Sequence, residues 1–159
     1  MEETAAEIKA LFYDDYLIEA YRKLTAAEAD TAFTEAYPDV EEFKIIKNTV
    51  TKVDKLLAEL GDLDSWRLIY EKGEIATFYK GSGTNFLMRA ELILDAPLFP
   101  VIALFSEVDL YHNWVPKIQA FEMIAEPTRF IKLLQYTLDL PWPVSNRDVC
   151  LSCQGVAIG

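Results

Sequence analysis

The chain has 159 residues, of which 52% are hydrophobic and 13% aromatic, and this composition fits one globular domain with a sizeable core. Its 26 acidic and 15 basic residues give a net charge of -11. Nucleic acid is therefore not an expected partner, because a negatively charged protein surface repels phosphates. The longest uncharged runs, 96–106 and 149–159, have eleven residues each, whereas a membrane-spanning helix needs roughly 20.

The start of the chain and its cysteine content favour a cytoplasmic protein. The first three residues, MEE, are acidic where a secretory signal is basic and then apolar, and two cysteines are too few for a disulfide framework. Residues 1–64 carry 16 acids against 7 bases, whereas residues 65–159 carry 10 against 8. We interpret the acidic part as a solvated helical face, and the alternative is that it recruits a protein partner.

Residues 1–64 are predicted to be helical. Three residue pairs have the spacing of a capping box or of its Asp variant, and each predicts a helix start: Thr4 and Glu7, Thr25 and Glu28, and Asp39 and Glu42. The third helix carries an apolar stripe at spacings of three and four: Phe43, Ile46, Val50, Val53, Leu57 and Leu60. This helix is predicted to end at Gly61, because glycine is a good C-terminal cap.

After Gly61 the apolar period changes from 3.6 to 2, which predicts a meander of three strands separated by glycine turns: 66–71, 75–80 and 86–95. The first strand is expected to place Trp66, Leu68 and Tyr70 on one face. The third has apolar residues at its even positions, which indicates one buried face. The apolar segment from Pro97 to Phe105 is predicted to be a short helix buried against the sheet.

Strands are predicted again at 118–125 and 128–139, joined at Glu126-Pro127, and from Val149 onward. In the second of these, the even face is expected to look inward, since most of its residues are apolar: Phe130, Leu134, Tyr136 and Leu138. The order of helices, three strands, a helix and further strands predicts an α+β fold with a curved, mostly antiparallel sheet. Such a sheet is either filled by side chains or encloses a cavity.

No residue pattern gives a good catalytic or metal-binding signal. Cys150 and Cys153 are three apart on a predicted strand, so their sulfurs point to opposite faces and cannot both hold one metal. His112 has no Ser or Cys in a nucleophile motif to pair with, and the glycines at 81–83 lie between strands rather than before a helix. We therefore expect no catalytic residue, no metal and no cofactor.

Three segments from about Trp66 onward resemble the START lipid-transfer domains of the Bet v 1-like helix-grip superfamily. The most specific is 140–149, LPWPVSNRDV, which looks like the aromatic-proline loop and Arg-Asp pair that lead into a central strand of these domains. Residues 94–98, LDAPL, precede a predicted helix, and residues 114–116, WVP, precede a predicted strand, where similar family segments fall.

The resemblance implies a helix-grip fold, in which an incomplete antiparallel barrel wraps around a long C-terminal helix. It also implies a hydrophobic tunnel for one lipid, such as a sterol, phospholipid or ceramide, and no catalysis. Residues 1–64 would then be an acidic N-terminal extension with the first domain helix, and 65–159 a partial START-like domain. Because the family continues past the strand at Val149, we expect this sequence to be truncated, with its last strands and closing helix missing.

By position in the family, the loop motif would be structural, with Arg147 and Asp148 fixing the loop through charge-assisted hydrogen bonds beside Trp142 and Pro143. The expected tunnel wall consists of apolar residues on three strands: Phe86, Met88, Leu92, Leu134, Tyr136, Val149 and Leu151. Some sterol-binding members carry a facing acid and base inside the tunnel, and alignment places Leu134 and Cys153 there, so that no polar clamp is expected.

The leading hypothesis is a non-enzymatic domain that binds one lipid and transfers or senses it between membranes, with transient contact at a membrane surface. One alternative is an enzyme of the same superfamily, such as a cyclase or hydrolase, which needs polar groups converging in the cavity. Its candidates are Lys132, His112 and Tyr136. The other alternative is a regulatory module whose acidic helices bind a protein.

Overall fold

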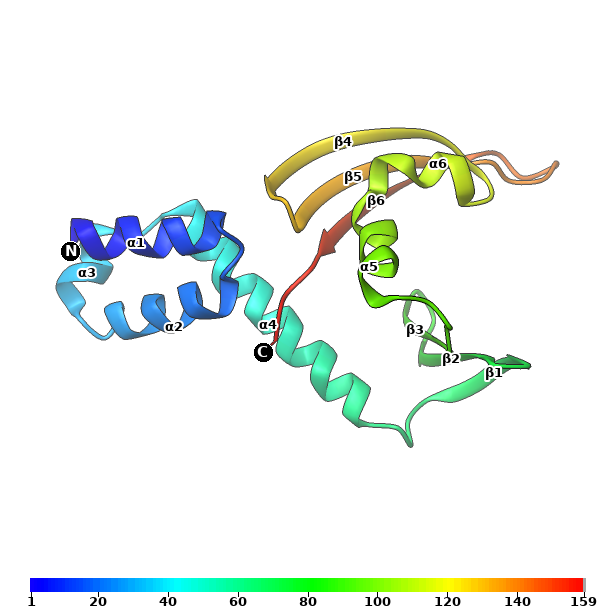
Figure 1. Cartoon of the computed structure of the whole chain (residues 1–159), viewed down its shortest axis with the longest axis horizontal. Helices are drawn as coiled ribbons and strands as arrows, with labels where there is room; N and C mark the ends of the chain where they lie inside the picture. The colour runs from blue at the N-terminus through cyan, green and yellow to red at the C-terminus, as the bar shows by residue number, and fades with distance from the viewer. Residues whose placement is uncertain (159) are drawn as a thin grey trace. The chain divides into compact units, whose positions relative to one another are not determined.

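The computed structural model describes residues 1–158 (Figure 1). It divides into two compact units: residues 54–103 form one, and the rest of the described chain forms the other. Helices and antiparallel strands are both present, which makes the fold α+β. None of the helices within residues 1–158 is both long enough and apolar enough to cross a membrane.

Four helices open the chain: α1 (Glu2–Tyr13), α2 (Leu17–Ala27), α3 (Thr31–Ala36) and α4 (Glu41–Gly61). The predicted start near Asp39 and the predicted end at Gly61 are confirmed for α4. The starts predicted at Thr4 and Thr25 are wrong, because both residues lie inside helices. Capping-box spacing also missed the starts of α2 and α3; at α3 the Asp30 carboxylate accepts a hydrogen bond from the Ala32 N–H at 3.0 Å.

The core of the first four helices is closed. Ile8, Leu24 and Ile46 are 0% exposed, and α1 and α2 lie side by side in Figure 1. Ile131, at the start of a later strand, is buried in the same apolar cluster. The Arg129 guanidinium reaches the carboxylate of Asp15 at 3.4 Å, so a turn between later strands is also ion-paired to the α1–α2 connection.

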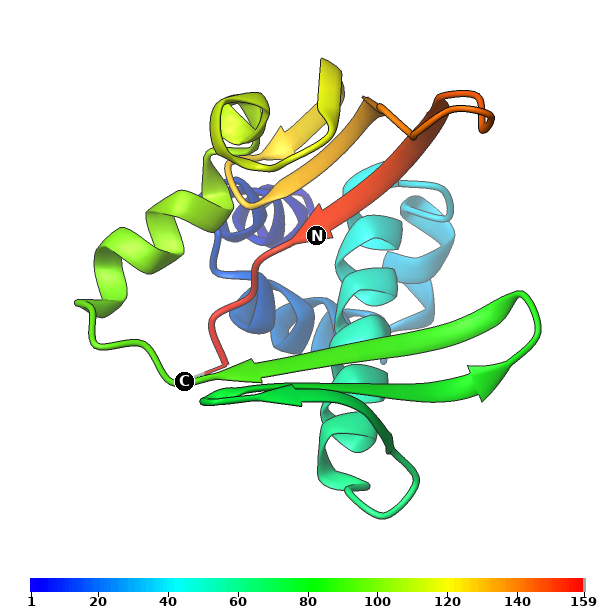
Figure 2. The same cartoon turned by 90° about the vertical axis from the view of Figure 1, so that its right-hand side faces the viewer.

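The first sheet has the order β1-β2-β3, with β1 (Arg67–Lys72), β2 (Ile75–Ser82) and β3 (Asn85–Leu92) antiparallel (Figure 2). Gly73 forms the first turn with φ of +61°, a conformation that glycine adopts without strain. A β-bulge at Ile69 pairs Tyr70 with Thr77. The predicted face shared by Leu68 and Tyr70 is therefore wrong, because the extra residue moves Tyr70 to the other face.

Three helical segments connect the sheets: α5 (Leu98–Ser106), the 3-10 turn η1 (Val108–Leu110) and α6 (Tyr111–Trp114). The helix predicted from Pro97 to Phe105 is confirmed as α5, but its predicted burial is wrong, since α5 has no buried residue and Phe99 is 83% exposed. An apolar helix is buried only where another element packs against it, and the amino-acid composition of the helix does not show whether such an element is present. By contrast, η1 and α6 pack on the following strand.

The second sheet has the order β4-β5-β6, with β4 (Ile118–Thr128), β5 (Ile131–Leu138) and β6 (Arg147–Gln154) antiparallel. The predicted connection at Glu126-Pro127 is wrong, because both residues lie within β4 and the turn follows at 129–130. The register shifts between Ala125 and Thr128, so Pro127 sits at an irregularity where its missing N–H breaks no regular ladder bond.

Candidate functional site

One face of the first sheet is largely apolar. Directly paired residues of antiparallel strands point to the same face, and Met88 pairs with Tyr79 while Leu92 pairs with Ile75. The register thus brings together the three candidate residues of β3. The β1–β3 apolar face, as we name it, consists of six residues: Tyr70, Ile75, Tyr79, Phe86, Met88 and Leu92.

The β1–β3 apolar face is open to solvent. Met88 is 61% exposed, Phe86 53% and Leu92 50%. The rings of Tyr79 and Phe86 stack with centroids 5.7 Å apart, so the aromatic residues contact one another across the strands. Large apolar side chains that are half exposed and adjacent form a surface suited to an apolar partner.

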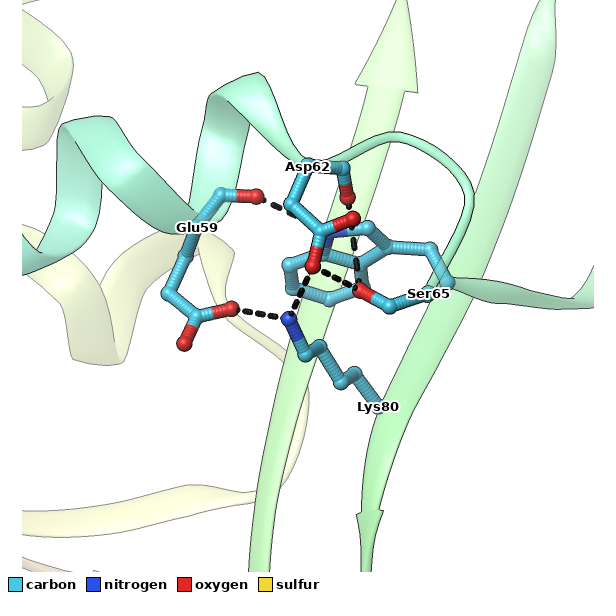
Figure 3. Close-up of polar contacts among 5 residues, drawn as sticks. Glu59, Asp62, Ser65 and Lys80 are labelled. Atoms are coloured by element: carbon cyan, nitrogen blue, oxygen red, sulfur yellow. Dashed lines mark hydrogen bonds and ion pairs between the residues drawn. The ribbon is translucent and has the colours of Figure 1, made fainter.

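The end of α4 contacts the opposite face of this sheet (Figure 3). The Trp66 indole N–H donates to the carbonyl of Glu59 at 3.0 Å, and the Lys80 ammonium bonds the carboxylates of Glu59 and, at 2.9 Å, Asp62. The hydroxyl of Ser65 donates to Asp62 at 2.7 Å. Hydrogen bonds from Ser65 and Lys80 lower the pKa of Asp62. These contacts bind α4 to β2 and occupy one side of the sheet only.

The second sheet also has an apolar face. Leu134 pairs with Leu151 and Tyr136 pairs with Val149, so the register brings together the four candidate residues of β5 and β6. The β4–β6 apolar face, as we name it, includes two further residues from β4 and has six members: Phe121, Met123, Leu134, Tyr136, Val149 and Leu151. Unlike the first face it is partly covered, because Leu134 is 0% exposed and the ammonium of Lys132 donates to the Ser106 carbonyl at 3.1 Å.

Besides the hydroxyl of Tyr136, the polar groups at the β4–β6 apolar face are Lys132, Cys153 and Tyr111. Lys132 pairs in register with Cys153, and its ammonium lies 3.3 Å from the carboxylate of Glu126. Burial raises the pKa of the Cys153 thiol in spite of the nearby Lys132 charge, which makes this cysteine a poor nucleophile. Burial, reinforced by the neighbouring Cys153 and Tyr136, raises the pKa of Tyr111.

The residues considered for an enzyme do not converge. His112 is exposed, and its Nδ1 lies 2.8 Å from the backbone carbonyl of Asp109. Lys132 is engaged by the Ser106 carbonyl and by Glu126, which leaves Tyr136 as the remaining candidate on the apolar face. Cys150 pairs with Gln135 and so lies on the face opposite to Cys153.

The loop 139–146 presents Trp142, which is 92% exposed, and Pro143 at its tip. The side chain of Asn146 holds this loop in place. Its Oδ1 accepts a hydrogen bond from the Leu140 N–H at 3.3 Å, and its Nδ2 donates one to Gln119 at 3.0 Å. Sequence reasoning missed Asn146, although asparagine side chains commonly bond nearby backbone in loops.

The Arg-Asp pair that follows the loop lies within β6. The carboxylate of Asp148 accepts from the hydroxyl of Thr137 at 2.8 Å, a contact that ties β6 to β5. Arg147 makes no side-chain hydrogen bond or ion pair within residues 1–158, so the side-chain contacts that fix the loop come from Asn146 instead, beside the backbone bonds from Asp139 N–H to Lys117 and from Val144 N–H to Pro141.

No protein-family model matches the chain, and a sequence comparison with curated proteins gives no match. Among solved structures, the chain is similar to a STAR-related lipid transfer protein from Xanthomonas axonopodis, with 25% identity over 55% of this chain and 50% of that one and a TM-score of 0.47. It is also similar to human STARD10, with 17% identity over 61% of this chain and 41% of that one and a TM-score of 0.52. The chain thus covers half or less of the length of these two structures. The likeness to human STARD10 shows a START-like fold, which confirms the predicted fold class.

Proposed function

We propose that this chain is a non-enzymatic START-like domain that binds one lipid on an apolar wall and transfers or senses it between membranes. The observation that carries the proposal is the gathering of the candidate residues by strand register, Phe86, Met88 and Leu92 on one face and Leu134, Tyr136, Val149 and Leu151 on the other. The START-like fold supports it. We further propose that residues 65–159 form the lipid-binding part, that residues 1–64 form an acidic helical extension, and that the protein is cytoplasmic with transient membrane contact.

The physical driving force would be the burial of hydrocarbon. Each methylene of a lipid chain removed from water contributes about 0.8 kcal/mol, so one long acyl chain contributes on the order of 10 kcal/mol before the cost of ordering it. The exposed fractions of Phe86 and Met88 mean that the β1–β3 apolar face retains the surface such a chain would cover. Release would require a covering segment to open transiently at a membrane.

Native mass spectrometry of the protein purified without detergent tests this proposal. We expect a lipid to co-purify with the chain, and we expect Met88→Gln to lower the lipid-bound fraction several-fold because it places a polar amide in the apolar wall. Met88 is 61% exposed, so the substitution should leave the fold intact.

The matched control is Leu63→Gln, which makes the same kind of change at a residue that is 62% exposed and lies outside the strands. It should keep the lipid-bound fraction of the unmodified protein. Repeated recovery of a ligand-free protein would overturn the proposal, and so would an equal loss of lipid in both variants.

A further inference from the structure

The β-bulge of β1 decides which charged residues share the β1–β3 apolar face. If β1 had no bulge, strict alternation through Ile69 would place Glu71 on the same face as Arg67. With the bulge, Arg67 pairs with Tyr79 and Lys72 pairs with Ile75, whereas Glu71 pairs with Ala76 on the other face. The apolar face therefore receives two cations from β1.

No acid accompanies these cations among the paired residues of that face. The two glutamates of the paired strands, Glu71 and Glu91, both pair with Ala76 and lie on the opposite face. This distribution runs against the composition of the chain, which has 26 acids and 15 bases. The face is thus positive within a strongly acidic protein.

The cations on the two faces also differ in their partners. On the opposite face, Lys80 is bound by Glu59 and Asp62, and Arg89 is ion-paired with Glu91. On the apolar face, Arg67 and Lys72 have no ion pair and no side-chain hydrogen bond within residues 1–158. Their charges are therefore available to a bound anion.

From this charge distribution we propose that the ligand of the β1–β3 apolar face is a lipid with an anionic headgroup, a phosphate or a carboxylate, which is attracted to the positive β1 edge that carries Arg67 at one end and Lys72 at the other. The inference rests on the proposed function and names its ligand class. The hydrocarbon lies over Tyr79, Met88 and their neighbours, in the same cross-strand row as Arg67. A guanidinium and an ammonium beside an apolar surface complement a lipid that is anionic at one end and apolar at the other, because each end then meets matching chemistry.

The experiment incubates the protein with mixed vesicles that contain equal amounts of phosphatidylserine, phosphatidic acid and phosphatidylcholine, removes the vesicles, and identifies the bound lipid by native mass spectrometry. We expect the two anionic lipids to be enriched over phosphatidylcholine. Arg67→Gln and Lys72→Gln should each lower the ratio of anionic to zwitterionic lipid about fivefold while keeping the total bound lipid. The matched control is Lys55→Gln on α4, an exposed cation outside the sheet, which should keep the ratio.

The outcomes separate this inference from the proposed function. If the unmodified protein binds no lipid of any class, the proposed function fails and the inference fails with it. If it binds phosphatidylcholine as readily as the anionic lipids, or if Arg67→Gln and Lys72→Gln keep the ratio, only the headgroup assignment is overturned. Sedimentation with phosphatidylserine vesicles that depends on Arg67, without enrichment of anionic lipid after vesicle removal, would also overturn it, because the cations would then bind a membrane surface.

Discussion

The helical region α1–α4 and the β1–β3 sheet use the same kind of apolar side chain in opposite ways. In the helices, Ile8 and Leu24 are 0% exposed and Phe12 is 1% exposed. In the sheet, Phe86 is 53% exposed and Met88 is 61% exposed. Apolar residues therefore close a core in the helices as far as Val50 of α4 and form an open surface in the sheet.

The difference follows from how each kind of element buries its apolar side. An amphipathic helix presents a stripe that is covered once other helices pack on it. The helices α1, α2 and α3 and the first half of α4 supply one another with that cover, whereas Leu57 and Leu60 near the end of α4 stay 43% and 42% exposed. Strands of a single sheet contact their neighbours only edge to edge, so a face stays open unless another layer covers it. Here the end of α4 contacts one face of β1–β3 through Trp66 and Lys80, whereas Phe86 and Met88 on the other face are more than half exposed.

The largest expected effect tests the difference in packing between the helices and the β1–β3 sheet through the free energy of unfolding. Phe12→Ala should lower the free energy of unfolding by about 3–5 kcal/mol, because it removes a buried ring and leaves a cavity. Met88→Ala should change it by about 0.5 kcal/mol or less, because an exposed side chain leaves no cavity. Urea unfolding followed by circular dichroism measures both. A loss in Met88→Ala as large as that in Phe12→Ala would mean that the β1–β3 apolar face is packed rather than open.

How much of this could be predicted from the sequence differs between the two regions. The apolar stripe and terminal glycine of α4 predicted its course because both signals are local. The start of α3 was missed because Thr25 and Glu28 also have capping-box spacing, although that threonine lies in the last turns of α2. A spacing of three recurs by chance inside helices, and only the backbone conformation distinguishes a cap.

The sheet was harder to predict because its faces depend on register. For β3, β5 and β6, the alternation of apolar and polar residues predicted correctly that the candidate residues of each strand share a face. It failed for β1, since a bulge carries no clear sequence signal and one extra residue inverts every later position. The positive charge of the β1–β3 apolar face was invisible for the same reason.

A smaller effect is expected at the N-terminal cap of α3, which is a local polar contact in the helical region. Asp30→Ala should lower the free energy of unfolding by about 1 kcal/mol, because the Ala32 N–H loses its capping acceptor. Asp30→Asn is the matched control, since its amide oxygen caps nearly as well. Thermal unfolding of the two variants measures the difference, and equal losses would show that charge rather than capping is responsible.

The smallest effect concerns the ionic contacts that accompany the helical core. The Glu42 carboxylate of α4 accepts from the ammonium of Lys9 at 3.0 Å and from the hydroxyl of Tyr13 at 3.1 Å. Partial burial raises the pKa of Glu42, but the backbone N–H, Lys9 and Tyr13 together outweigh it and hold this pKa below its ordinary value. The ionised form is therefore favoured in the folded state, and its stabilisation is present above the unfolded glutamate pKa of about 4.3.

Glu42→Gln should consequently cost about 1 kcal/mol or less at neutral pH, and its difference from the unmodified protein should shrink as the pH falls through the lowered pKa of folded Glu42. Unfolding in urea at several pH values between neutral and acid measures this. Glu35→Gln on α3 is the control, an exposed glutamate without an ion pair within residues 1–158, and it should cost less at neutral pH. If the loss in free energy of unfolding caused by Glu42→Gln stays constant with pH, the charge of Glu42 does not contribute to the packing of α1 on α4. The helical region would then owe its closure to apolar packing alone, which is what the β1–β3 apolar face lacks.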